Sequence, residues 1–177
     1  MAILHSLTHC KSMSHRPRTL VVFHSRSGCT RRIGRMIAAR LKADVEEIGF
    51  AAPAHQVPGY ARCALQALAG CTASVRPARH DPAQYGLVVI GTPVWCWSLP
   101  APVRGWLKAH PLGAAQVALF CTMGGSGAAR VFAQLQQACG KRARAMLALT
   151  DAQVQAGPRT AVDAFCARLD RPHARSE

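Results

Sequence analysis

The sequence predicts an α/β fold: a three-layer, doubly wound parallel sheet of five strands with helices on both faces. Short apolar runs typical of buried strands alternate along the chain with segments whose apolar residues recur at helical spacing. The chain has 177 residues, 50% of them hydrophobic, which suffices for one sizeable core and hardly for two. We therefore expect a single domain whose strands are joined by right-handed crossovers.

The first half of the chain supplies two predicted strands and two predicted helices. The apolar run 19–23 predicts the first strand, and the spacing of apolar residues predicts an amphipathic helix over 30–42. A short extended segment over 44–48 predicts the second strand, and a helix is expected around 59–69. The stretch 72–82 is rich in proline and charge, which predicts a loop.

The second half continues this alternation. The apolar run 87–90 ends at Gly91, as expected of a strand buried on both faces of a parallel sheet. The remaining predicted elements are a short helix over 103–109, a strand over 117–121, a helix over 126–139, a strand over 145–149 and a closing helix over 160–169.

Three of the predicted strands end in segments suited to contact a ligand, namely 25–30, 92–98 and 122–127. In an open parallel sheet, ligands bind beyond the carboxyl ends of the strands, where the strand order reverses. The three segments are therefore expected to meet at one site.

The first of these segments has the features of a phosphate site. The hydroxyls of Ser25, Ser27 and Thr30 can donate hydrogen bonds, Gly28 permits a tight turn, and a helix N-terminus follows. The segment lacks the lysine of a Walker A motif and the spacing of G-x-G-x-x-G. A phosphate monoester held by neutral groups therefore fits better than a nucleotide triphosphate.

Composition restricts the partners and the location. The net charge is +14, and 18 of the 22 basic residues are arginine, which favours anionic partners. The arginines are scattered without a basic block or interleaved aromatic residues, so sequence-specific nucleic-acid binding is not expected. No apolar run reaches the ~18 residues of a membrane span. Because the N-terminus also lacks the apolar core of a signal peptide, we expect a cytoplasmic protein with eight reduced cysteines.

Three stretches together resemble the flavodoxins and flavodoxin-like FMN proteins. They are Ser25-Arg-Ser-Gly-Cys-Thr30 after the first strand, the segment Tyr85 to Trp95, and the segment Leu119 to Gly127. The resemblance covers Arg18 to Leu169 and implies the strand order 2-1-3-4-5, with FMN bound where that order reverses.

The resemblance also implies which residues contact FMN. The FMN phosphate would be held by Ser25, Arg26, Ser27, Gly28, Cys29 and Thr30. The isoalloxazine ring would lie along Thr92, Pro93, Val94, Trp95 and Trp97. The other edge of the ring would be approached by Thr122, Met123, Gly124 and Gly125.

The function implied is that of an FMN-dependent redox protein, because the flavin carries the chemistry and the protein orients it. Electrons would come from a nicotinamide or a reductase and leave to a small acceptor such as a quinone, or to a protein. This role covers both an electron-transfer flavoprotein and an NAD(P)H:acceptor oxidoreductase. No Ser-His-Asp set, paired carboxylate or HExxH motif is apparent, so no catalytic residue and no metal ligand is nominated.

Other interpretations remain open at this point. A flavin-free binding or regulatory module could use the same fold. Cys29 and Arg35 satisfy the Cys-x5-Arg pattern of a cysteine-dependent phosphatase, although the cysteine should stand nearer the end of the strand. Cys29, Cys96 and Cys121 are expected to pack as small apolar residues rather than to form redox pairs.

The ends of the chain are expected to lie outside the domain. Residues 1–18 predict a flexible N-terminal extension, 19–170 the flavodoxin-like FMN-binding domain, and 171–177 a flexible tail. Met13 is a second candidate start of the chain. The extension contains His5, His9, Cys10 and His15, whose irregular spacing argues against an ordered metal site.

Overall fold

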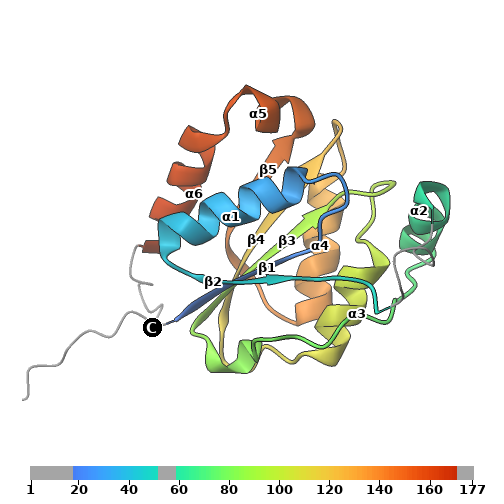
Figure 1. Ribbon diagram of the computed structural model, residues 1–177, viewed down its shortest axis with the longest axis horizontal. Coiled ribbons are helices and arrows are strands. Elements are labelled where there is room, and N and C mark those ends of the chain that lie inside the picture. The colour runs from blue at the N-terminus through green and yellow to red at the C-terminus, as the bar shows by residue number, and fades with distance from the viewer. Residues whose placement is uncertain (1–17, 52–58, 171–177) are drawn as a thin grey trace, which may run out of the picture.

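The computed structural model describes residues 18–51 and 59–170, and it contains the predicted five-stranded parallel sheet in the order β2-β1-β3-β4-β5 (Figure 1). The strands are β1 (Thr19–Phe23), β2 (Asp44–Glu47), β3 (Leu87–Pro93), β4 (Gln116–Met123) and β5 (Ala143–Thr150). The helices are α1 (Cys29–Leu41), α2 (Tyr60–Leu68), α3 (Ala101–Ala109), α4 (Ala128–Cys139), α5 (Asp151–Ala156) and α6 (Arg159–Asp170), with a 3-10 turn at η2 (Pro82–Gln84).

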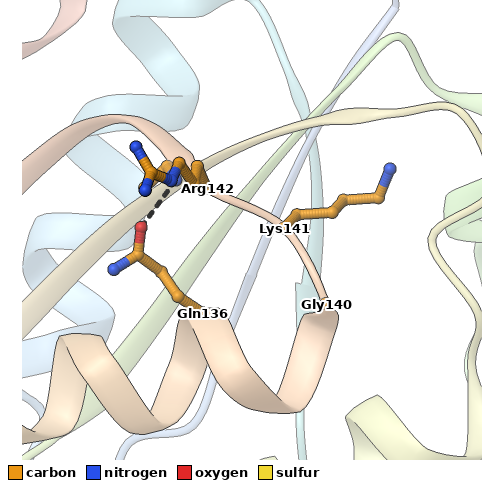
Figure 2. A pocket seen from close by; sticks show the side chains of 5 residues that line it. Gln136, Gly140, Lys141 and Arg142 are labelled. Atoms are coloured by element: carbon orange, nitrogen blue, oxygen red, sulfur yellow. Dashed lines mark hydrogen bonds between the residues drawn. The ribbon is translucent and has the colours of Figure 1, made fainter.

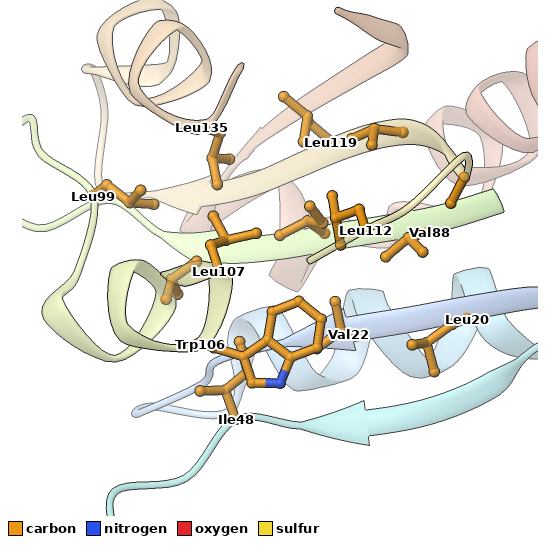
Figure 3. Packing of buried hydrophobic residues seen from close by; sticks show 14 of the residues in the cluster. Leu20, Val22, Ile48, Val88, Leu99, Trp106, Leu107, Leu112, Leu119 and Leu135 are labelled. Atoms are coloured by element: carbon orange, nitrogen blue, oxygen red, sulfur yellow. The ribbon is translucent and has the colours of Figure 1, made fainter. Parts of the chain in front are cut away.

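The two faces of the sheet carry separate apolar clusters, which creates the three layers. On β1, Leu20 and Val22 point to one face, where they pack with residues of α3 and α4 such as Trp106 and Leu135 (Figure 3). The alternate β1 residues, among them Phe23, pack with α1, α5 and α6 on the other face. Because the central strands are covered on both sides, they need the continuous apolar runs seen in the sequence.

The register of β1, β3 and β4 places a glycine between two phenylalanines. Phe23 pairs with Gly91, and Gly91 pairs with Phe120, so the glycine lies between two aromatic side chains on adjacent strands. A Cβ at Gly91 would lie 2.0 Å from the Phe120 ring, which shows that this ring fills the space above the glycine. The close approach holds the central strands together directly below the candidate site.

Two strands extend further than predicted. β3 ends at Pro93 and β4 at Met123, so Thr92, Pro93, Thr122 and Met123 belong to strands, and their placement in loops was wrong. The apolar pattern stops earlier because Thr92 and Thr122 are polar, yet both are buried. The hydroxyl of Thr122 shares a hydrogen bond with that of Thr30 on α1, and the hydroxyl of Thr92 donates to the carbonyl oxygen of Pro93, so neither polar group is buried without a partner.

The helix boundaries differ by a few residues at most, and one short helix was missed. Gly28 is the N-cap of α1 with a left-handed φ of 98°, so the helix begins at Cys29 rather than at Thr30. α5 was not predicted, although Thr150 and Gln153 form a capping box at its start. In the part of the chain that the structure describes, no helix is long and apolar enough to cross a membrane.

Residues 1–17 of the predicted extension, with Met13 and the candidate metal ligands His5, His9, Cys10 and His15, lie outside the described residues, as does the predicted tail. Arg18 is the first described residue. Its guanidinium donates to the carboxylate of Asp44 at the start of β2 and lies over the ring of Tyr85.

Candidate functional site

A cavity of about 500 Å³ opens at the carboxyl edge of the sheet, where all three predicted segments come together. It is lined by Arg26, Ser27, Pro93, Val94, Trp95, Thr122, Met123, Gly124 and Asp151. A volume of this size lies in the range of small-molecule sites, roughly 300 to 1,000 Å³. The other predicted site residues, Ser25, Gly28, Cys29, Thr30, Thr92, Trp97 and Gly125, lie beside the lining but do not form it.

The first segment folds into a closed turn at the N-terminus of α1. The Oγ of Ser25 accepts hydrogen bonds from the backbone N–H groups of Gly28 and Arg31, each at 3.2 Å. The hydroxyl proton of Ser25 stays available for donation, because both bonds use its oxygen as acceptor. The N–H groups of Cys29 and Thr30 have no acceptor within α1, as in the first turn of any helix. This turn is therefore built to receive an anion.

A buried hydrogen bond ties the first segment to the third. The hydroxyls of Thr30 and Thr122 are 2.8 Å apart, and both residues are buried. One donates and the other accepts, so α1 and β4 are fixed relative to each other. The bond fixes the distance between the anion-binding turn and the far wall of the cavity.

The second segment is a tight hairpin. Trp95 and Ser98 exchange two backbone hydrogen bonds of 3.2 and 2.9 Å around Cys96 and Trp97. Cys96 and Trp97 have left-handed φ values of 47° and 56°, which cost of order 1 to 3 kcal/mol each and persist only where neighbours enforce them. Trp95 is buried in the wall of the cavity, whereas Trp97 is 59% exposed at the rim.

The third segment offers an open backbone. A Cβ added at Gly124 or Gly125 would meet no atom within 4 Å, so a flat group can approach the chain closely there. Gly127 differs, because a Cβ at this position would come within 2.9 Å of the Trp97 indole. Trp97 also donates its Nε1–H to Ser126 Oγ at 2.8 Å, which couples the second segment to the third.

Two residues of this region were missed by the sequence analysis. Asp151 lines the cavity from the start of α5, and the capping-box pattern of Thr150 and Gln153 would have revealed that helix. His24 is a polar residue directly after a buried strand, and it lies edge-on to the rings of Phe50 and Trp95 at 5.7 and 5.5 Å. The sequence could have indicated His24 as a candidate site residue, because it directly follows the apolar residues 20–23 of the strand.

His24 is held as a neutral ring. It lies 2.8 Å from the carbonyl oxygen of Ile48, which only accepts, so Nδ1 carries the proton and donates. Nε2 is buried without a hydrogen-bond partner among the described residues. Burial is the largest cause that lowers the pKa of His24, and the cations Arg26 and Arg31 act in the same direction. The hydrogen bond to Ile48 and the charge of Glu47 raise it and offset part of this effect.

The cysteines of this region are spread over different environments. Burial raises the pKa of Cys121 to about 12, so its thiol stays protonated and packs as an apolar group. Cys29 is the first residue of α1, and Arg35 is an exposed residue of the same helix. Arg35 is six positions further along the helix than Cys29, a rise of about 9 Å along the axis, so the two residues do not form the loop of a cysteine-dependent phosphatase.

A second cavity, of about 600 Å³, lies at the other edge of the sheet, between the end of α4 and the start of β5 (Figure 2). Lys141 and Arg142 flank it, and Gln136 accepts a hydrogen bond from the backbone of Ala143 beneath it. None of the three predicted segments reaches this cavity. Within residues 18–51 and 59–170, no group of three or more His, Cys, Asp or Glu side chains could hold a metal ion.

Comparison with known proteins identifies the family and the fold. A family model described as flavodoxin matches residues 18–154 of the chain. A flavoprotein from Lactobacillus acidophilus, solved in complex with FMN, is 21% identical with a TM-score of 0.65, over 80% of this chain and 98% of that chain. Oxidised flavodoxin 2 from Bacillus cereus is 15% identical with a TM-score of 0.53, over 85% of this chain and 96% of that chain. No curated protein matches the sequence.

Proposed function

This chain belongs to the flavodoxin family, and from that premise we propose that it binds FMN at the carboxyl edge of the sheet and carries electrons. The observation that supports this most strongly is the cavity to which all three segments contribute. An anion-binding helix N-terminus, a buried tryptophan and an open glycine backbone meet there. This combination fits a ligand with a phosphate at one end and a flat ring at the other.

In this proposal the turn before α1 holds the phosphate. Ser25, Ser27 and Thr30 supply hydroxyls, while Cys29 and Thr30 supply the first backbone N–H groups of the helix. Arg26 lines the cavity and adds one positive charge, and Gly28 provides the left-handed turn.

The ring occupies the space between the second and third segments. We assign its contacts to Thr92, Pro93, Val94 and Trp95 on one side and to Thr122, Met123, Gly124 and Gly125 on the other. Trp97 contacts the ring edge from the rim. Asp151 faces the same cavity, and its carboxylate accepts hydrogen bonds from hydroxyls of the ribityl chain.

Bound FMN supplies the redox chemistry, and the protein supplies binding, orientation and exclusion of water. Trp95 closes one wall of the cavity and is itself 4% exposed, so it shields the ring from solvent. We propose a nicotinamide or a reductase as electron donor and a quinone-like small molecule or a protein as acceptor. The protein is then an electron-transfer flavoprotein or an NAD(P)H:acceptor oxidoreductase.

Titration of the full-length chain with FMN tests this proposal. Binding should quench FMN fluorescence with 1:1 stoichiometry, and the purified protein should show the absorption of a flavin. Riboflavin is the matched control, because it has the same ring and no phosphate. It should bind at least about tenfold more weakly, since a lost charge-assisted hydrogen bond costs roughly 1.5 to 3 kcal/mol. FMN fluorescence that stays unquenched would contradict the proposal.

A further inference from the structure

The helices that begin at the carboxyl edge carry arginine where helices ordinarily carry acids. The first turns of α1, α2 and α4 contain no acidic residue. α1 and α4 follow the first and third segments directly, and α2 lies at this edge because its Cys63 packs with Trp95. The first turn of each contains an exposed arginine, and we call these three residues the arginine rim: Arg32, Arg62 and Arg130. α5 is the exception, since Asp151 lies in its first turn and lines the cavity.

This arrangement works against the stability of the helices. The N-terminus of a helix carries a partial positive charge, so a cation in the first turn is unfavourable. The same arginines at helix C-termini would be favourable. The arginine rim therefore has no explanation in the stability of these three helices.

Few carboxylates offset the positive charge at this edge. The carboxylate of Glu47 is occupied by Arg31, whose Nε and Nη2 donate to it at 2.6 to 3.0 Å. Asp151 faces the cavity. At the opposite edge, by contrast, Asp44 pairs with Arg18, and Asp170 pairs with Arg40. The described acids thus neutralise cations mainly away from the candidate site.

The rim carries more charge than a phosphate monoester requires. The phosphate turn already has the N-terminus of α1 and Arg26. The three rim arginines lie on three separate helices, and none of them lines the cavity. Their positive charge faces solvent rather than the bound ligand.

An exposed tryptophan lies at the same edge of the sheet. Trp97 is 59% exposed, and the hydrogen bond to Ser126 and the contact with Gly127 fix its orientation. Tryptophan and arginine are the residue types that most often dominate the binding energy of protein interfaces. A rigid indole also loses little conformational entropy when a partner covers it.

We propose that the carboxyl edge, with the exposed Trp97 and the arginine rim, is the docking surface for a protein whose matching face is acidic. The identification of that protein with the electron donor or acceptor rests on the proposed function. The positive charge of the rim and the exposed indole do not depend on it. A protein fits better than a nucleic acid, because the sequence has no basic block with interleaved aromatic residues.

The test uses the full-length, ¹⁵N-labelled chain at low salt and decaglutamate as a probe for an acidic protein face. The amide signals of the carboxyl edge and the indole N–H of Trp97 should shift on titration. The variant R32E/R62E/R130E should weaken decaglutamate binding about tenfold or more, because rim charges set the salt-dependent part of an interface.

The matched control is K108E/R142E/R168E, in which exposed cations of the opposite edge are reversed. Each variant exchanges three cations for three anions, so both fall from +14 by six charges to +8. The control should change decaglutamate affinity less than about twofold if location matters more than net charge. Circular dichroism of both variants verifies that they fold.

Three results would overturn the proposal: equal weakening in both variants, no binding of decaglutamate by the parent chain, or tighter binding of an oligothymidylate that carries the same charge. The last result would assign the surface to nucleic acid. Because these titrations need no FMN, a failure of FMN binding leaves their outcome intact, and the two proposals fail separately.

Discussion

His24 is the side chain that most directly couples the end of β1 to the walls of the cavity. Its Nδ1–H donates to Ile48 after β2, and its ring contacts Trp95, which lines the cavity. Its other nitrogen is buried, so a proton there would have to be desolvated. The observed packing therefore requires the His24 ring to be neutral.

Stability should therefore fall in mild acid. Because burial lowers the pKa of His24, the unfolded chain binds a proton at this residue below about pH 6.5 while the folded protein does not. The free energy of unfolding decreases as pH falls from about 6.5 towards the folded-state pKa, by about 1.4 kcal/mol per pKa unit of depression. Urea unfolding between pH 5 and 8 measures this.

The variant His24→Asn identifies the group responsible. The asparagine amide can still donate to Ile48 but does not titrate, so the dependence on pH should flatten. His110→Asn, at the residue that follows α3, makes the same substitution away from the cavity and is the matched control. An unchanged slope in His24→Asn would assign the effect to other groups.

Close packing in the central strands gives a second prediction at this scale. A methyl group at Gly91 would collide with the Phe120 ring at 2.0 Å, and the ring is fully buried, so it has little room to move. Gly91→Ala should lower the free energy of unfolding by about 1 to 3 kcal/mol through overpacking. Gly124→Ala adds the same methyl group in open space and should stay within about 0.5 kcal/mol of the parent. Equal effects of the two substitutions in urea unfolding would refute the argument.

At the scale of the elements, the type and order of strands and long helices were predictable, because apolar periodicity reports burial. The ends of β3 and β4 were not, since Thr92 and Thr122 are polar in sequence but buried in the folded protein. Thr122 finds its hydrogen-bond partner, Thr30, only when α1 packs against the sheet. α5 was not predicted, because a helix of six residues is too short to show a clear apolar periodicity. The site was predictable as three segments at one edge. Asp151 was not, because it enters through the unpredicted α5.

Helix ends supply a prediction about the arginine rim. Arg130→Glu places an acid in the first turn of α4, where the helix dipole favours it, so the free energy of unfolding should rise by about 1 kcal/mol at low ionic strength. Arg168→Glu makes the same charge change in the last turn of α6 and should lower it by a similar amount.

Thermal unfolding at low and high salt distinguishes these effects from net charge. The two variants have identical net charge, so a shift of the same sign in both would show that overall charge, and not position on the helix, decides stability. Salt should reduce both shifts, because it screens exposed charges.

At the scale of the whole molecule, the sheet brings together residues that are about a hundred positions apart in sequence, as the hydrogen bond between Thr30 and Thr122 illustrates. The two apolar clusters fix the helices on both faces of the sheet (Figure 1). The loops at the carboxyl edge connect these helices to the strands, so the packing of the clusters also positions the loops. The central claim is that these loops form one site and hold FMN together.

The most direct measurement of this claim is a map of backbone amide shifts in the ¹⁵N-labelled full-length chain as FMN is added. If the three loops hold FMN together, the amide signals of residues 25–30, 92–98 and 122–127 should shift over the same range of FMN concentration. The signal of Asp151 should shift with them. Shifts confined to one of these segments, or centred on Gln136 and Arg142 at the opposite edge, would contradict it.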